Sequence, residues 1–132
     1  QQAMSVDSAK IRRFLDSSLG RRIVKAEKVW REAPFVLAVP CQELPLNNSL
    51  EYCGDETVLL QGVIDCYFEE QGSLVLVDYK TDKAADGILE AIREKYLFQI
   101  SCYARALEKL SGKPVKEKYI YLFSSEKVIS YE

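Results

Sequence analysis

The chain has 132 residues, of which 48% are hydrophobic and 29% are charged. This balance is typical of a globular protein rather than a disordered one, and the length suits one compact domain with its own core. The formal net charge of −2 disfavours a general nucleic-acid-binding protein, which usually carries a strong positive excess. No signal peptide opens the chain, and no apolar run approaches the roughly 20 residues of a membrane-spanning helix. We therefore expect a cytoplasmic protein that does not contact membranes.

The first predicted element is a helix over Ser5–Ser18, because apolar residues recur there at helical spacing, and Gly20 can end it. A short second helix is predicted over Arg21–Glu27. The apolar run within Trp30–Val39 predicts a strand. The stretch Gln42–Asp55, which contains proline, asparagine and glycine, reads as a loop or a lengthened hairpin turn.

Two further strands are predicted over Thr57–Phe68 and Leu74–Lys80. The residues between them, Glu69–Ser73, carry a tight-turn signal, so we expect an antiparallel hairpin. The second of these strands is apolar on both faces until its end, which is typical of a central strand that is covered on both sides.

A long helix is predicted from about Asp86 to Ser111, ended by Gly112 and Pro114. Two last strands, Lys116–Phe123 and Lys127–Tyr131, read as a second hairpin. The order of elements indicates a single α/β domain, residues 1–132, with one sheet. The inner face of the long helix is predicted to consist of Ile88, Ile92, Tyr96, Gln99, Ile100, Tyr103, Ala104 and Leu107.

Four cysteines occur without a CxxC pair, and the chain has no histidine. A zinc site or an iron–sulfur cluster therefore has little support. We expect the cysteines to be free thiols that pack as small apolar residues and stay reduced. They are Cys41, Cys53, Cys66 and Cys102.

Two acidic residues, Asp65 and Asp78, each follow an apolar strand segment, and Lys80 comes two residues after Asp78. A hairpin can bring both carboxylates to one place, and side chains two apart in a strand face the same side. Buried carboxylates are costly unless they are paired or bind a metal, and their oxygens suit Mg²⁺ or Mn²⁺. The pattern favours a metal site, although a charged residue at a strand end is often only a solvated terminus.

Further motifs follow in order along the chain: Gly62-Val63-Ile64-Asp65, then Asp78-Tyr79-Lys80-Thr81-Asp82, then Gln99 with Tyr103-Ala104 four residues later. From about Trp30 to Phe123 this series resembles the RecB-type branch of the PD-(D/E)XK nucleases, and within it the C-terminal nuclease domains of AddAB-type bacterial helicase–nucleases. The resemblance implies a restriction-endonuclease-like fold, a mixed β-sheet of about five strands flanked by helices.

By this resemblance Asp65 and Asp78 bind Mg²⁺ or Mn²⁺, the backbone carbonyl of Tyr79 is a third ligand, and Lys80 is the catalytic lysine. The implied activity is that of an exonuclease that hydrolyses single-stranded DNA in helicase-coupled repair of double-strand breaks. The implied partners are DNA, helicase domains of the same chain and a second, AddB-like subunit.

The long helix contributes the other candidates. The resemblance implies that Gln99 supports catalysis and that Tyr103 contacts DNA. Basic residues of the same helix could bind phosphates, although a solvated helix face is the commoner reason for such charges. These basic residues are Arg93, Lys95 and Arg105. Glu32 is a weaker candidate, an acid at the edge of the site or a solvated charge before a strand.

One departure from the family pattern concerns the metal ligands. In this family a histidine from an upstream helix commonly completes the metal shell, and this sequence contains none. We interpret the chain as a C-terminal fragment of a larger polypeptide that begins downstream of that helix. The alternative is a catalytically weak or silent module of the same fold that binds DNA or a partner.

Overall fold

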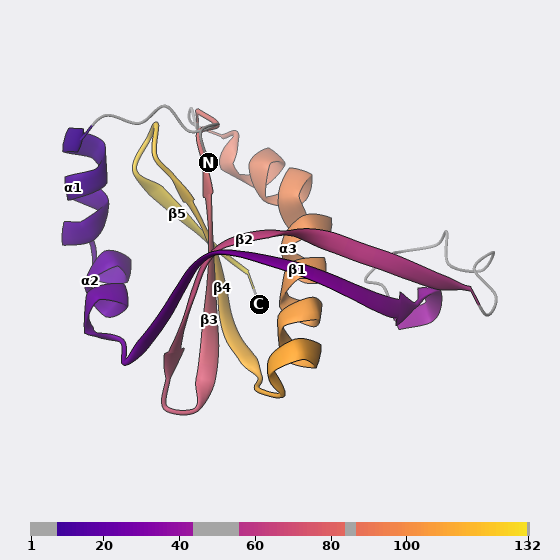
Figure 1. Ribbon diagram of the computed structural model, residues 1–132. Coiled ribbons are helices and arrows are strands. Elements are labelled where there is room, and N and C mark those ends of the chain that lie inside the picture. The colour runs from indigo at the N-terminus through magenta and orange to yellow at the C-terminus, as the bar shows by residue number, and fades with distance from the viewer. Residues whose placement is uncertain (1–7, 44–55, 84–86, 132) are drawn as a thin grey trace.

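Five strands form one mixed sheet in the order β1-β2-β3-β4-β5 (Figure 1). Strands β3 and β4 are parallel and the other neighbours are antiparallel. The computed structural model describes residues 8–43, 56–83 and 87–131. The elements are α1 (Ser8–Asp16), α2 (Ser18–Lys25), β1 (Lys28–Pro40), η1 (Cys41–Glu43), β2 (Thr57–Glu70), β3 (Ser73–Lys80), α3 (Leu89–Ser111), β4 (Val115–Leu122) and β5 (Lys127–Tyr131). The predicted α/β fold and its order of elements are confirmed.

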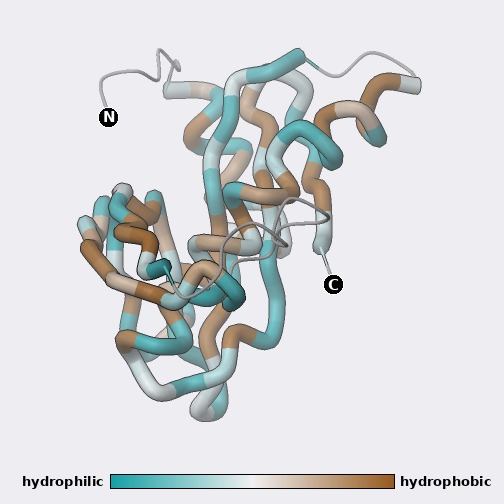
Figure 2. Tube along the Cα trace, turned by 90° about the vertical axis from the view of Figure 1, so that its right-hand side faces the viewer, coloured by the Kyte–Doolittle hydropathy of each residue, from teal (hydrophilic) through white to brown (hydrophobic). Residues whose placement is uncertain are grey.

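Helices cover both faces of the sheet: α1 and α2 lie on one side and α3 on the other (Figure 1). Strand β3 shows why it is central, because Leu74 and Leu76 enter the core beside α3 whereas Val75 and Val77 enter the core beside α1 and α2. All four are buried. Elsewhere hydrophobic and hydrophilic residues alternate along the chain, as elements with one solvated face require (Figure 2).

The β2–β3 connection is a two-residue turn. Both central residues, Gln71 (φ 53°) and Gly72 (φ 81°), have positive φ angles, as a type I′ hairpin turn demands. The predicted antiparallel hairpin is therefore confirmed. The long helix ends where expected too, because Gly112 adopts the left-handed conformation (φ 75°) at its C-terminus.

Strands β1 and β2 both bend near their middle and run away from the rest of the sheet as a two-stranded arm (Figure 1). Ile64 and Tyr67 pack on the same core although they lie three residues apart, whereas an unbroken strand places same-face side chains an even number apart. Opposite this point Glu32 has a φ of 50°. The irregularity is of the kind that a β-bulge produces, and it turns Asp65 towards the end of β3.

The boundary between the first two helices differs from the prediction. Gly20 does not end the first helix. Ser17 separates the two helices, and its side chain accepts a hydrogen bond from the Gly20 N–H (3.1 Å) as the N-cap of α2. A serine oxygen satisfies an otherwise unpaired helix N–H, and this local signal outweighs the usual helix-ending role of glycine. Gly20 serves packing instead, since a Cβ there would lie 2.1 Å from the Phe14 carbonyl oxygen.

We expect Gly20→Ala to destabilise the protein by about 1–3 kcal/mol, the usual cost of overpacking. The added methyl group would meet backbone atoms of Phe14 and Leu15, which cannot move as a flexible side chain can. Urea denaturation measures the change. Arg21→Ala, on the exposed side of the same helix, is the control, and equal midpoints for the two variants would contradict this account.

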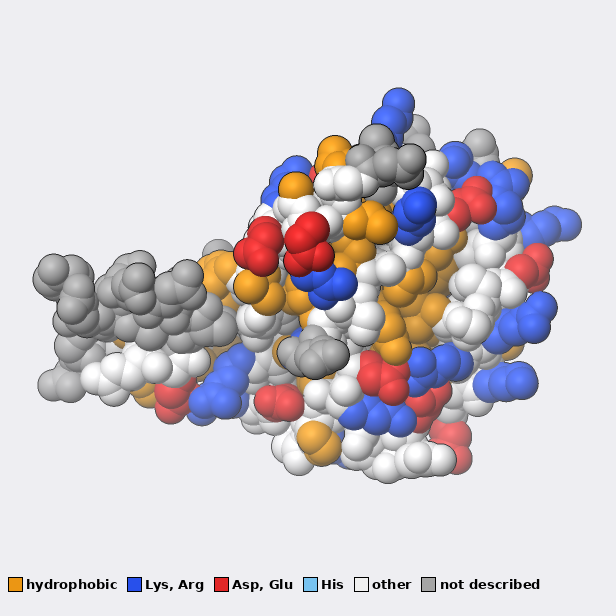
Figure 3. Space-filling view, turned by 180° about the vertical axis from the view of Figure 1, so that it is seen from behind, with side chains coloured by type: hydrophobic (Ala, Val, Ile, Leu, Met, Phe, Trp, Pro, Cys, Tyr) orange, Lys and Arg blue, Asp and Glu red, His pale blue; other side chains and the backbone are white. Residues whose placement is uncertain are grey.

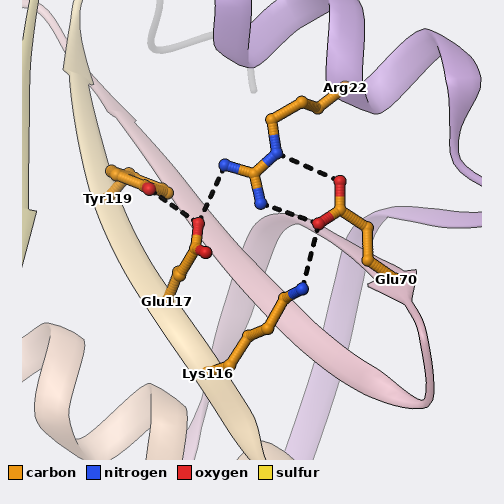
Figure 4. A network of polar contacts seen from close by, with 5 residues as sticks. All are labelled: Arg22, Glu70, Lys116, Glu117 and Tyr119. Carbon is orange, nitrogen blue, oxygen red and sulfur yellow. Dashed lines mark hydrogen bonds and ion pairs between the residues drawn. The ribbon is translucent and has the colours of Figure 1, made fainter.

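A network of ion pairs joins α2 to the sheet (Figure 4). Arg22 makes two hydrogen bonds to Glu70, from Nε (3.0 Å) and Nη2 (2.7 Å), and its Nη1 lies 2.8 Å from Glu117. Lys116 pairs with Glu70 at 3.1 Å, and the Tyr119 hydroxyl donates to Glu117 at 2.6 Å. Paired, planar contacts of this kind fix the orientation of arginine. A cavity of about 520 Å³ adjoins the network beside α2.

Glu70→Gln should lower stability near neutral pH by about 1 kcal/mol and flatten the acid dependence of unfolding. The hydrogen bonds from Arg22, with those from Lys116, lower the pKa of Glu70 from 4.5 to about 2. Stability from this carboxylate is therefore present above its ordinary pKa and is lost as pH falls from 4.5 towards about 2. Urea titrations across this window test the change. Glu27→Gln is an exposed control, and an unchanged acid slope for Glu70→Gln would contradict the prediction.

The described cysteines depart in one respect from the expectation of free thiols. Cys66 and Cys102 are free and buried, and burial raises the pKa of both thiols, which makes them packing residues. Cys41 is disulfide-bonded, so the expectation is wrong for that residue. Within the described ranges, no helix has the length and apolar character to cross a membrane.

Candidate active site

Asp78 and Lys80 lie at the C-terminal end of β3, on the face that α3 covers. The Lys80 Nζ atom is 3.1 Å from Asp78 Oδ2, and only 5% of the Asp78 side chain is exposed. The expectation that two residues spaced i and i+2 share a face therefore holds. The contact lacks hydrogen-bond geometry, so Asp78 Oδ2 is a buried oxygen without a hydrogen-bond partner among the residues that the structure describes.

Asp65 reaches the same place from β2. The ladder between β2 and β3 ends at the Cys66–Val77 pair, because β2 bends away. Beyond that pair the Tyr79 N–H donates a hydrogen bond to Asp65 Oδ2 at 2.9 Å. The carboxylate thus replaces a strand partner at the end of the ladder, and it is in hydrogen-bonding contact with Asp78. The two acids lie side by side, as the hairpin argument predicts.

The Tyr79 side chain points to the opposite face, where it packs among Phe14, Phe123 and Cys66. Burial raises the pKa of its hydroxyl, so this tyrosine is a neutral anchor. The aromatic anchor on one face and the Asp65 bond to the Tyr79 backbone hold the end of β3 in place. This arrangement positions the carboxylate of Asp78 between them.

The electrostatics of Asp78 are those of a charge held at a cost. Burial is the largest effect and, with the neighbouring Asp65, raises the pKa of Asp78 from 3.8 to about 7, whereas Lys80 opposes the change. Two adjacent carboxylates with one ammonium leave excess negative charge in a dry place. A divalent cation would offset that charge, and such perturbed acids are typical of functional sites.

Gln99 and Tyr103 of α3 lie one turn apart beside the acidic pair. Tyr103 stands edge-on to Phe35, with ring centroids 5.4 Å apart, and a Cβ at Gly62 would lie 2.9 Å from its hydroxyl oxygen. Glycine at that position therefore makes room for the tyrosine. Burial raises the pKa of Tyr103, as do the nearby Asp78 and Asp65 charges, while contact with Gln99 opposes them. The helix motif and the acids thus form one cluster.

The donor set fits a hard divalent cation with an incomplete protein shell. Asp78 Oδ2 is buried without a hydrogen bond in the described part of the chain, and carboxylates are the ligands that Mg²⁺ and Mn²⁺ prefer. No group of three or more His, Cys, Asp or Glu side chains within the described ranges could hold a metal. Two carboxylates with a backbone carbonyl and water remain the available ligands, which suits Mg²⁺ because it keeps several waters.

A family model described as the PD-(D/E)XK nuclease superfamily matches residues 2–130. The chain belongs to this superfamily. Its motif residues are the ones just described: Asp78 with Lys80 two positions later, and Asp65 on the preceding strand. Members of the superfamily generally depend on divalent metal ions, in keeping with the buried acids of this site.

Relatives of the PD-(D/E)XK domain are helicase–nucleases by name, each a component of an ATP-dependent helicase/nuclease. The chain is 56% identical over 131 residues to that protein from Acetivibrio thermocellus, 48% over 130 to that from Ruminiclostridium cellulolyticum and 47% over 129 to that from Clostridium novyi. These matches cover 97–99% of the chain and 10% of each relative. The chain thus spans about a tenth of the length of these relatives.

The basic residues proposed for DNA contact do not form one row on the PD-(D/E)XK domain. Arg93 bonds the Ser130 carbonyl and lies 3.5 Å from Glu90, Lys95 is 2.9 Å from Asp82, and Arg105 is 3.1 Å from Glu43. At about 100° per residue the three project from different sides of α3. Acidic and basic side chains also intermingle on the face seen in Figure 3. DNA contact by these residues stays a prediction, with Lys95 the one nearest the acids' end of β3.

Two residues near the PD-(D/E)XK acids carry a signal that the sequence pattern does not reveal. Tyr96 was expected only as part of the inner helix face, and Asp82 only as the end of a motif. Tyr96 lies under Lys80, 4.5 Å from its Nζ to the ring centroid, and its hydroxyl donates to Asp82. The helical spacing of Tyr96 and Gln99 places them on one face, but only the fold shows that Lys80 lies there. Glu32, by contrast, is exposed at the bend, and its role stays a prediction.

Proposed function

We propose that this chain is a metal-dependent deoxyribonuclease domain that cleaves phosphodiester bonds of single-stranded DNA with Mg²⁺ or Mn²⁺. The observation that carries the proposal is the pair of adjacent carboxylates, Asp65 and Asp78, with the Lys80 ammonium beside them in a buried position. A structural ion pair would need only one carboxylate. A second one beside it raises the energy of the charged site, which a cation would offset.

In this proposal the residues have separate roles. Asp65, Asp78 and the Tyr79 backbone carbonyl hold the cation, and when bound the cation supplies an activated water and charge for the phosphoryl oxygens. Lys80 orients the attacking water and offsets phosphate charge, for which its three N–H donors suit it. Gln99 and Tyr103 form the α3 side of the site and contact the DNA strand.

The setting follows from the relatives' name, which joins an ATP-dependent helicase to a nuclease. We propose that the domain acts on a strand released by helicase domains of the same polypeptide, with a second AddB-like subunit, in the repair of double-strand breaks. In that setting the phosphate contacts of the domain are non-specific and weaken with salt. The DNA substrate places this activity in the bacterial cytoplasm.

A cleavage assay tests the proposal directly. The chain, Asp78→Ala and Lys80→Ala are incubated with end-labelled single-stranded or duplex DNA and Mg²⁺, Mn²⁺ or a chelator. We expect metal-dependent cleavage of single strands by the unaltered chain and by the surface variants Lys127→Ala and Asp16→Ala, and none by the two site variants. Labels at the 5′ and 3′ ends report polarity.

The competing function is a silent module that binds DNA without cleaving it. The absence of a third acidic or histidine side chain near the pair, within the described residues, is the observation that favours it. Equal DNA binding by all variants with no cleavage by any of them would establish this alternative and reject the nuclease proposal for this chain.

A further inference from the structure

The ammonium group of Lys80 touches two partners. One is Asp78 Oδ2 at 3.1 Å. The other is the face of the Tyr96 ring, whose centroid lies 4.5 Å from Nζ, inside the range of a cation–π contact. Tyr96 belongs to α3 and is half-buried, so the lysine bridges the end of β3 and the helix that covers it.

Tyr96 is itself held from the strand side. Its hydroxyl donates a hydrogen bond to Asp82 Oδ1 at 2.7 Å, and Lys95 Nζ is 2.9 Å from Asp82 Oδ2. Asp82 follows Lys80 by two residues, so the chain leaving β3 returns a carboxylate to the same ring that the lysine covers. Both oxygens of Asp82 are thus used to fix the N-terminal half of α3 against the end of β3.

This geometry solves a problem that lysine poses at such a site. A lysine side chain is a flexible stem with a point charge, and Asp78 cannot both bind a cation and remain its sole anchor. An aromatic face attracts an ammonium group without accepting any of its N–H bonds. All three donors of Lys80 therefore stay available for water and phosphate.

We propose that Tyr96, oriented by Asp82, is a positioning residue that holds the Lys80 ammonium at the acidic pair. The proposal rests on the proposed nuclease function for its kinetic consequence, but the contact itself does not. A purely structural Tyr96 would act through stability alone. A positioning Tyr96 acts on the turnover step, because the misplaced group is one that meets the reacting phosphate.

Tyr119 provides a matched control on the opposite side of the sheet. It is also half-buried, and its hydroxyl also donates to a carboxylate, Glu117, at 2.6 Å. Four variants compare the two positions: Tyr96→Phe, Tyr96→Leu, Tyr119→Phe and Tyr119→Leu. Thermal melting of each separates loss of fold from loss of positioning.

We expect Tyr96→Leu to lower kcat roughly three- to thirtyfold with KM unchanged, the range that a lost cation–π contact covers. Tyr96→Phe keeps the ring and should recover most of the rate, and Asp82→Asn should resemble it. Both Tyr119 variants should turn over as the unaltered chain does. A loss in Tyr96→Leu that Tyr119→Leu matches, or that appears only in KM, would overturn the proposal.

A second readout does not need activity. In protein labelled with ¹³C-lysine, the Lys80 ε-methylene signal, assigned by its absence in Lys80→Arg, should be shifted upfield by the Tyr96 ring. The shift should persist in Tyr96→Phe and both Tyr119 variants and vanish in Tyr96→Leu. A Lys80 signal at the ordinary lysine position in the unaltered chain refutes the inference whatever the activity. An upfield signal in a chain that cannot cleave DNA supports the contact and rejects the proposed function.

Discussion

Lys80→Ala is expected to lower the rate of DNA cleavage roughly 10³-fold, the usual cost of removing a group that stabilises charge at the reacting centre. The same change should leave binding of Mn²⁺ intact or strengthen it. The ammonium lies 3.1 Å from Asp78 Oδ2 and repels any cation that the carboxylate binds. Its removal therefore separates two properties that a general loss of fold would abolish together.

Cleavage assays and calorimetric titration with Mn²⁺ measure the two properties on the same samples. Lys127→Ala removes an exposed lysine from β5 and serves as the control, with no change in either. A Lys80→Ala protein that cleaves at the unaltered rate would remove lysine from the mechanism. One that no longer binds Mn²⁺ would instead show that Lys80 supports the folded site.

Asp78→Asn should act with opposite signs on metal binding and on stability. Burial, with Asp65 beside it, raises the pKa of Asp78 to about 7, so the folded protein favours the protonated form. The stability that this group contributes is present below its ordinary pKa of 3.8 and is lost as pH rises towards about 7. Above neutral pH the metal-free protein therefore carries a buried charge at a cost.

Asparagine has nearly the same shape without the charge, so Asp78→Asn should stabilise the metal-free protein above neutral pH on the order of 2 kcal/mol. The difference should vanish in acid. Mg²⁺ or Mn²⁺ should raise the melting temperature of the unaltered chain, because a ligand bound only to the folded state stabilises it, and should leave Asp78→Asn unchanged. Melting curves with and without metal at several pH values measure both effects. A variant that is less stable above neutral pH, or that still responds to metal, would contradict this account.

The metal-free instability and the proposed catalysis share one cause. The bend in β1 and β2 ends the β2–β3 ladder at Val77, which leaves the next strand residues free to form a site instead of a sheet. Asp65 occupies the gap by accepting the Tyr79 N–H. Strand irregularities near functional sites recur because they direct a side chain that a regular ladder would place elsewhere.

Local patterns were sufficient for most of the fold. The apolar run of β3, the Gln71-Gly72 turn and the stop of α3 at Gly112 each depend on neighbouring residues, and each was predicted correctly. The start of α2 was not, because Ser17 and Gly20 carry competing signals. Only the close approach of Gly20 to the Phe14 carbonyl shows that this glycine is required for packing between two helices.

The sequence by itself determined the fold class, the order of elements and the pairing of Asp65 with Asp78, since spacing along two hairpin strands places both acids at one level. It also identified Lys80, because residues two apart in a strand share a face. Only the tertiary structure decided how these groups are held. The bulge that directs Asp65, the burial that raises the pKa of Asp78 and the Tyr96 ring beneath Lys80 arise from contacts between segments distant in sequence. Such contacts follow from the packing of α3 across the sheet, which no local pattern of residues specifies.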